Sequence, residues 1–300
     1  MKLNYKREGS GEPLIIVHGL FGNLDNWQTL GKKFAEDFDT IIVDQRNHGH
    51  SPHDDVFNYD VMAEDLIELI NDLNLKNVNI IGHSMGGKAT MRLAQLRPDL
   101  LHKIVIVDIG PKGYPIHHDT ILEGLHAIDF DVVKTRGDAD KVLSKYISAP
   151  DVKMFLLKNL YWKEKGQLDW RINLPVISDN MEKIVAAIPK DVVGTSTLFI
   201  RGEKSNYIVE EDYNDIFNQF INSDIETIYN AGHWIHAENP FDFYQLVMDF
   251  LNSKITWLFF KNSTAIFVCP LLYILYLKSA DQYNRLLNRF LYVRLLWVPD

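Results

Sequence analysis

Short apolar runs alternate along the chain with stretches in which apolar residues recur at helical spacing. The runs predict strands at residues 14–17, 40–43, 78–81, 104–107, 197–200 and 227–229, with a further strand at the N-terminus. Residues 59–70, between the second and third of these runs, show a helical pattern. Strands that alternate with helices are typical of a mostly parallel sheet with helices on both faces. The chain is therefore predicted to be an α/β protein.

The alternation stops between residues 112 and 190, where the pattern is helical and several aromatic residues occur. A connection of this length between two strands usually has a function. It would lie over the carboxyl ends of the strands, where the active sites of open α/β sheets form. We therefore expect a core made of residues 1–111 and 191–254, and a helical cap at residues 112–190.

The C-terminal segment, residues 255–300, differs in kind from the rest. Residues 255–277 are almost wholly apolar. The segment as a whole contains five basic and two acidic residues. A run of this length can cross a bilayer, but Lys261 and Pro270 interrupt it. Membrane association through residues 255–277 is therefore not favoured. A packed helical appendage and a segment added by a reading-frame slip near Lys254 stay open.

Composition narrows the classes of function. Three hundred residues, 46% of them apolar, suit one large domain or a domain with an insert. The net charge of −9, with no basic stripe, argues against a nucleic-acid partner. Cys269 is the only cysteine, so no intrachain disulfide can form, and residues 1–6 lack the apolar stretch of a secretory signal. Both observations favour a cytoplasmic protein.

A Gly-His-Ser-Met-Gly sequence occupies residues 82–86, between the predicted strand 78–81 and a helical stretch. A strand, a sharp turn and a helix around a serine are what a nucleophile elbow requires. The turn strains the backbone of the serine, and the residues two before and two after it pass so close that only glycine fits. Ser84 is thus the candidate nucleophile. The competing interpretation is a glycine-rich turn whose serine has no chemical role.

A serine nucleophile needs an adjacent base that is oriented by an acid. In this architecture the order along the chain is serine, acid, histidine. Of the eleven histidines, His233 is the best candidate base, because it follows the last predicted strand and its loop can return over the elbow. His236 is the nearest rival and is expected to pack structurally. The two histidines do not make a zinc site, since no third ligand is evident.

The position of the acid in this sequence differs from the usual one. In the usual arrangement an aspartate follows the strand that precedes the last strand, and the catalytic histidine follows the last strand. Ser205 stands where that aspartate would fall, and a serine cannot carry the charge that stabilises an imidazolium. Asp108, at the carboxyl end of the strand 104–107, could reach the same histidine from the neighbouring strand. Glu203 and Asp212 are weaker candidates for the acid. The competing interpretation of Asp108 is structural, with its side chain capping the next turn.

An oxyanion hole needs two backbone N–H groups that point at the developing charge. Met85, which follows the nucleophile, is expected to supply one of them. Leu20, in the His-Gly-Leu-Phe-Gly-Asn loop at residues 18–23, is expected to supply the other. His18 is expected to shape this loop rather than to catalyse. The pair at residues 117–118, His-His, is expected to lie on the surface or pack locally.

Four segments of the chain, residues 18–27, 44–52, 82–89 and 232–238, resemble the α/β-hydrolase superfamily, and the resemblance covers roughly residues 10–252. They look like the bacterial YbfF-type esterases and their eukaryotic relatives, the ABHD11-like hydrolases. The Asn-His pair at residues 47–48 is the most discriminating, because most superfamily members carry Arg-Gly there. The resemblance implies hydrolysis of carboxylic esters and acyl thioesters, including acyl-CoA, without a cofactor. It also implies a triad of Ser84, Asp108 and His233.

The expected partner is a small acyl ester or thioester, and no metal is expected. Parts of the cap, residues 155–162 and 169–174, are also similar to the family. Apolar side chains of the cap more often pack inside the cap than contact substrate. Substrate contacts are expected at aromatic and apolar side chains of the cap, of the loop at residues 18–23 and of the loop that contains His233: Phe21, Phe155, Leu157, Trp162 and Trp234.

Two other functions stay open. Carbon–carbon bond hydrolases and menaquinone-pathway lyases of the same fold keep a serine triad, but they normally retain the later aspartate that Ser205 replaces. A non-catalytic receptor or scaffold is the alternative of another class. Turnover of a nitrophenyl ester by the purified protein separates the enzyme from the scaffold.

Overall fold

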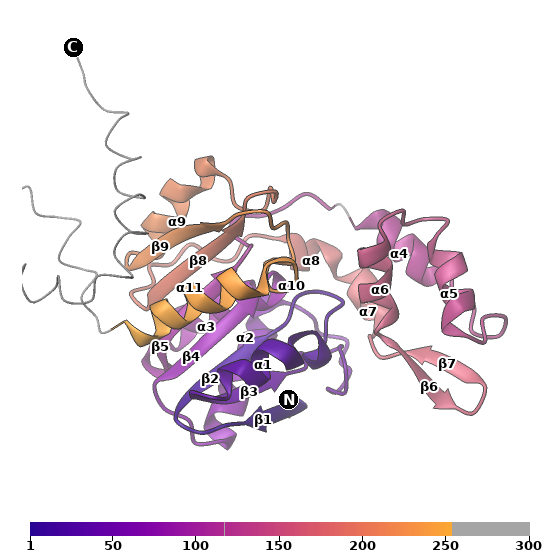
Figure 1. The fold of residues 1–300 in the computed structure, drawn as a ribbon, viewed down its shortest axis with the longest axis horizontal. Coiled ribbons are helices and arrows are strands. Elements are labelled where there is room, and N and C mark those ends of the chain that lie inside the picture. The colour runs from indigo at the N-terminus through magenta and orange to yellow at the C-terminus, as the bar shows by residue number, and fades with distance from the viewer. Residues whose placement is uncertain (117, 254–300) are drawn as a thin grey trace, which may run out of the picture. The chain divides into compact units, whose positions relative to one another are not determined.

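A computed structural model describes residues 1–116 and 118–253, and Met1–Ser253 form one compact unit (Figure 1). Its centre is a seven-stranded sheet with the strand order β1-β3-β2-β4-β5-β8-β9. β1 pairs antiparallel with β3, and the other neighbours pair parallel. The mostly parallel α/β sheet predicted from the alternating pattern is therefore confirmed. The strands are β1 (Tyr5–Glu8), β2 (Glu12–Val17), β3 (Phe38–Val43), β4 (Val78–His83), β5 (Leu101–Val107), β8 (Ser196–Gly202) and β9 (Ser223–Ile228).

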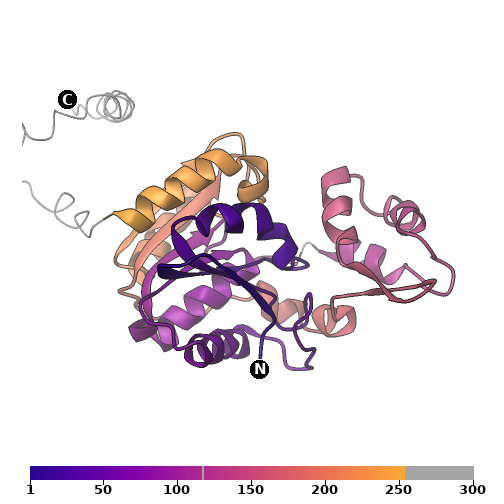
Figure 2. The same ribbon diagram turned by 60° about the horizontal axis from the view of Figure 1, so that its bottom comes forward.

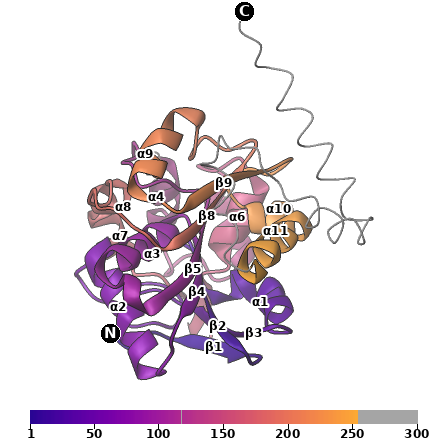
Figure 3. The same cartoon turned by 90° about the vertical axis from the view of Figure 1, so that its left-hand side faces the viewer.

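Helices cover both faces of the sheet (Figure 3). One face packs against α2 (Tyr59–Asp72), α3 (Met85–Leu96) and α9 (Tyr213–Gln219), and the other against α1 (Gln28–Phe34) and α11 (Pro240–Asn252). Successive residues of a strand point to opposite faces. In β2, Ile15 and Val17 accordingly join the first core, and Leu14 and Ile16 the second. This double burial explains why the predicted strands read as continuous apolar runs.

The main difference within the sheet lies in β9, which begins at Ser223 although the apolar pattern placed its start at residue 227. Its first four residues, Ser-Asp-Ile-Glu, do not form an apolar run. β9 is the last strand of the sheet and its side chains are mostly half-buried. An edge strand can therefore carry polar residues that a central strand would bury.

A group of short elements follows β5 and stands beyond the sheet (Figure 2). We call residues 119–185 the inserted segment. It holds α4 (Asp119–His126), α5 (Arg136–Leu143), α6 (Pro150–Leu157), α7 (Leu174–Asp179) and α8 (Met181–Val185). The segment is mainly helical, as predicted, but it also contains β6 (Leu160–Glu164) and β7 (Gln167–Trp170), which form an antiparallel hairpin. Its turn contains Gly166 with φ +85°, a conformation that glycine adopts without strain.

The compact unit ends just after α11. The Lys103 ammonium, from β5, donates to the carbonyl oxygens of Phe250, Leu251 and Ser253 at 2.7–2.9 Å. It thereby satisfies carbonyls that the end of a helix leaves unpaired. The features predicted for residues 255–300 lie outside the described residues. Within the described ranges, no helix combines the length and the apolar character needed to cross a membrane.

Candidate active site

The turn at Ser84 connects β4 to α3 and has the geometry of a nucleophile elbow. Ser84 has φ 52° and ψ −118°, a strained combination for a residue with a side chain. Its N–H donates to the carbonyl of Val107 on β5 at 3.0 Å. A Cβ atom on Gly82 would lie 2.6 Å from the carbonyl oxygen of Gly86, and one on Gly86 would lie 2.5 Å from that of Val17. The backbone therefore closes this turn only with glycine on both sides of the serine.

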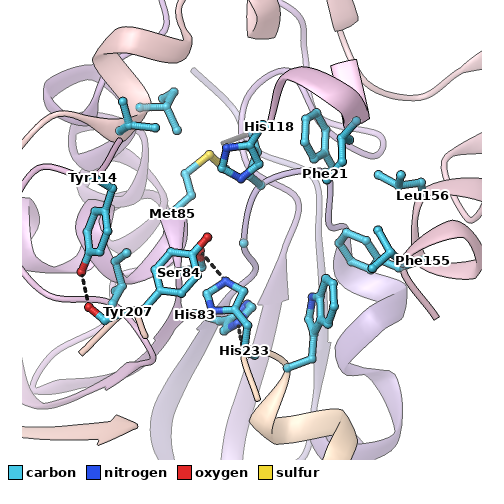
Figure 4. A pocket seen from close by; sticks show the side chains of 18 of the residues that line it. Phe21, His83, Ser84, Met85, Tyr114, His118, Phe155, Leu156, Tyr207 and His233 are labelled. Atoms are coloured by element: carbon cyan, nitrogen blue, oxygen red, sulfur yellow. Dashed lines mark hydrogen bonds between the residues drawn. The ribbon is translucent and has the colours of Figure 1, made fainter. Parts of the chain in front are cut away.

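His233 links the side chains of Ser84 and Asp108. Its Nε2 lies 3.1 Å from Ser84 Oγ (Figure 4). Its Nδ1 lies 2.7 Å from Asp108 Oδ2. The ring of Tyr207 stacks on the imidazole, with 4.0 Å between the ring centroids and 18° between the planes. The three residues follow β4, β5 and β9, so they meet at the carboxyl ends of the strands. The structure thus brings the predicted nucleophile, acid and base together.

The carboxylate of Asp108 is fully buried and accepts several hydrogen bonds. Its Oδ1 accepts the N–H of Gly202 at 3.1 Å, and its Oδ2 accepts the hydroxyl of Ser205 in addition to the His233 ring. A buried carboxylate needs such donors to offset the loss of water. Ser205, which stands where the usual aspartate would fall, therefore supports the carboxylate that occupies the other position.

The rival residues have other partners. Glu203 accepts the N–H of Asn230 at 2.9 Å, and Asp212 forms an ion pair with Lys112 at 2.6 Å. His236 is buried and stacks on Trp27 with 4.0 Å between the centroids. Across residues 1–116 and 118–253, no three His, Cys, Asp or Glu side chains are grouped so that they could hold a metal ion.

The two predicted oxyanion donors, Leu20 and Met85, both line the cavity that contains Ser84. Met85 is the first residue of α3, where a backbone N–H has no partner within the helix. No hydrogen bond of either N–H to another protein group occurs among the described residues. The oxyanion-hole role of these two N–H groups stays a prediction.

His18 holds the loop that contains Leu20. Its Nδ1–H donates to the carbonyl of Gly19 at 2.8 Å, and its Nε2 accepts the N–H of Gln45 at 3.0 Å. Burial lowers the pKa of His18 to about 4, so the ring stays neutral and keeps one acceptor nitrogen. These contacts give His18 a role in shaping the loop.

Other buried histidines near the site also have a lowered pKa. Burial lowers the pKa of His48 and of His236 to about 3, and it lowers the pKa of His83 well below 6.5. Between pH 6.5 and pH 4 the unfolded chain therefore binds protons at these histidines that the folded chain does not bind. The free energy of unfolding is expected to fall as the pH is lowered through this range. Each such histidine makes the free energy of unfolding depend more steeply on pH in this range.

Urea denaturation at pH 7, 6, 5 and 4 measures this dependence. The matched variant is His236→Phe, which keeps an aromatic ring against Trp27 and removes one titrating group. Its free energy of unfolding should depend less steeply on pH than that of the wild type. Equal slopes for the two proteins would contradict the prediction.

A cavity of about 280 Å³ opens beside Ser84 and His233 (Figure 4). Two tyrosine hydroxyls in its wall are bonded to the protein itself, since Tyr59 donates to the Ile184 carbonyl and Tyr114 donates to the Tyr207 carbonyl at 2.8 Å. Most of the lining is apolar or aromatic, from the two loops, α3 and the inserted segment: Leu20, Phe21, Met85, Ile109, Ile121, Val152, Phe155, Leu156, Ile184, Val185 and Trp234.

The predicted substrate contacts divide into two groups. Phe21, Phe155 and Trp234 line the cavity, and the rings of the last two lie 5.5 Å apart. The structure does not bring Leu157 or Trp162 to it. Leu157 is buried in the core of the unit, and Trp162, on β6, is 58% exposed.

The histidine pair at residues 117–118 was expected to lie on the surface or to pack locally. His118 lines the cavity, where it meets the ring of Phe21 edge-on, rather than lying on the outer surface. Residue 117 lies outside the described residues. His118 is the residue directly before α4 and so directly before the inserted segment.

Comparisons with known proteins identify the family of the chain. A family model described as the α/β-hydrolase fold matches residues 12–136. Esterase YbfF of Escherichia coli is 36% identical over 258 residues, which cover 84% of this chain and 100% of that protein. The Danio rerio protein named sn-1-specific diacylglycerol lipase ABHD11 is 36% identical over 81% of this chain and 80% of its own length.

A solved structure of a marine microorganism esterase is 41% identical, with a TM-score of 0.82, and the match covers 83% of this chain and 99% of that one. These proteins include the two groups that the four sequence segments resemble. The chain belongs to the α/β-hydrolase family, with YbfF and ABHD11 among its relatives.

Proposed function

We propose that the chain is a serine hydrolase that cleaves carboxylic esters and acyl thioesters through an acyl-enzyme on Ser84. The observation that carries the proposal is the hydrogen-bonded series Ser84–His233–Asp108 beside an apolar cavity. The relatives named as esterases and as a lipase support the ester hydrolysis.

The reaction follows from the positions of these groups. Nε2 of His233 takes the proton of Ser84 Oγ as this oxygen attacks the acyl carbonyl. The N–H groups of Leu20 and Met85 stabilise the oxyanion. His233 then protonates the leaving oxygen or sulfur, and a water that His233 activates releases the acid. Asp108 accepts Nδ1–H throughout and so keeps Nε2 free to exchange the proton.

The apolar cavity supports an uncharged acyl group as the part of the substrate that is bound there. The attacked carbonyl is the same in an oxygen ester and in a thioester, so acyl-CoA falls within the proposed range of substrates. We assign residues 112–190 the role of a cap, because α4, α6 and α8 contribute cavity residues such as Ile121, Phe155 and Ile184. The single cysteine, Cys269, supports a cytoplasmic location for this activity.

A substrate panel tests the proposed function. We expect the purified protein to hydrolyse nitrophenyl acetate, butyrate and laurate and also butyryl-CoA, and we expect a fluorophosphonate probe to label Ser84. Release of nitrophenolate and of free thiol gives the two rates, and intact-mass measurement gives the labelling. A protein that turns over no ester or thioester and takes up no probe would contradict the proposal.

A further inference from the structure

Phe21, the residue directly after the proposed oxyanion donor Leu20, is held from both sides. Its φ is 58°, in the left-handed region that an aromatic residue rarely adopts. Its N–H donates to Nε2 of His48 at 3.2 Å, and its carbonyl accepts Nδ2–H of Asn159 at 2.7 Å. Neither partner belongs to the loop that contains Phe21. A conformation of this kind persists only where the surroundings fix it.

His48 is built to accept the Phe21 N–H. Its Nδ1–H donates to the carbonyl of Arg46 at 2.9 Å, which leaves the lone pair on Nε2. The ring is fully buried, and burial lowers its pKa to about 3, so the acceptor persists at neutral pH. His48 therefore has a structural use next to the loop that contains Leu20.

Asn159 reaches Phe21 from the inserted segment. It lies between α6 and β6 and is 1% exposed, and its Oδ1 accepts Nδ2–H of Asn23 at 3.3 Å. Asn173, which follows the β6–β7 hairpin, donates its N–H to the carbonyl of Asn47 at 2.9 Å and its Nδ2–H to Oδ1 of Asn47 at 3.2 Å. The hairpin is thus fastened on both sides to the loops around the proposed oxyanion hole.

We propose that His48 and Asn159 are positioning residues for the oxyanion hole. They fix the backbone of Phe21, and this sets the direction of the preceding Leu20 N–H toward the acyl carbonyl on Ser84. Because Asn159 belongs to the inserted segment, the oxyanion hole is complete only while that segment is docked on the loop. The inference rests on the proposed ester hydrolysis through Ser84.

Asn159→Ala tests the inference. Turnover of nitrophenyl butyrate gives kcat and KM, and inhibition by a trifluoromethyl ketone, which forms an oxyanion on the serine, reports on the hole directly. We expect kcat to fall about 10- to 100-fold, since loss of a whole oxyanion donor costs about 10²- to 10³-fold. KM should stay within about twofold, and the affinity for the ketone should fall by the same factor as kcat. His48→Phe keeps a ring, removes the acceptor, and should give the same pattern.

Asn180→Ala is the matched control. Asn180 is also a buried asparagine of the inserted segment, 7% exposed, but its Nδ2–H donates to the carbonyl of Val176 at 2.8 Å, away from the loop. Its kcat and ketone affinity should stay within about threefold of the wild type. Urea denaturation shows whether the Asn159→Ala and His48→Phe variants are folded. If the folded variants change kcat and ketone affinity no more than this control does, the inference is wrong. A wild type without turnover or fluorophosphonate labelling would instead refute the proposed function.

Discussion

Ser84→Ala is expected to lower kcat for a nitrophenyl ester by about 10⁶-fold, the loss typical of a serine hydrolase without its nucleophile. The alanine has no oxygen to attack the acyl carbonyl, while the cavity and the backbone N–H groups remain. KM should therefore change little. Nitrophenolate release over hours measures the residual rate, and intact mass after exposure to a fluorophosphonate shows whether a covalent adduct forms.

Ser144→Ala controls for the loss of a serine hydroxyl. Ser144 lies at the end of α5, and its Oγ donates to the carbonyl of Asp140, far along the chain from the elbow. This variant should keep wild-type turnover and take up one equivalent of the probe. A probe adduct on the Ser84→Ala protein would show that another residue is the nucleophile.

Asp108→Asn is expected to lower kcat by about 10⁴-fold. The amide can donate to Nδ1 of His233, and this moves the ring proton to Nε2, where it blocks the transfer from Ser84. The same substitution weakens the contacts of the carboxylate with Ser205 and Gly202. Steady-state kinetics with nitrophenyl butyrate measure the effect, which should appear in kcat rather than in KM.

Glu203→Gln and Asp212→Asn are the corresponding controls, because both are carboxylates near the site with partners other than His233. Each should retain kcat within about threefold of the wild type. A large kcat defect in either variant, together with a near-normal Asp108→Asn protein, would assign the acid elsewhere.

The sequence was sufficient to place Ser84, His233 and Asp108 together, because each carries a local signal. Ser84 lies between a strand and a helix with glycine at both critical positions, and His233 follows the last strand. Asp108 is the favoured candidate because Ser205 leaves the usual place without a charge and β5 is the adjacent strand, with Glu203 and Asp212 as weaker alternatives. Secondary structure and strand order are enough to predict that such residues lie close together, because the fold brings the carboxyl ends of parallel strands to one edge of the sheet.

The walls of the cavity could not be predicted in the same way. Phe155, Leu156 and Leu157 are consecutive apolar residues of one short helix, so hydrophobicity does not tell which of them meets the cavity. Asn159 gives no local signal either. Its contact with Phe21 spans 138 residues, and it depends on how the inserted segment docks, which no short pattern encodes.

The hydrogen bond between Ser205 and Asp108 limits the negative charge that is buried next to His233. The two residues follow β8 and β5, which are paired neighbours, and their side chains already touch. A chain with aspartate at both positions would hold two carboxylates at hydrogen-bond distance, one of which would keep a proton. Serine at residue 205 instead gives the Asp108 carboxylate a hydroxyl donor without adding a second negative charge.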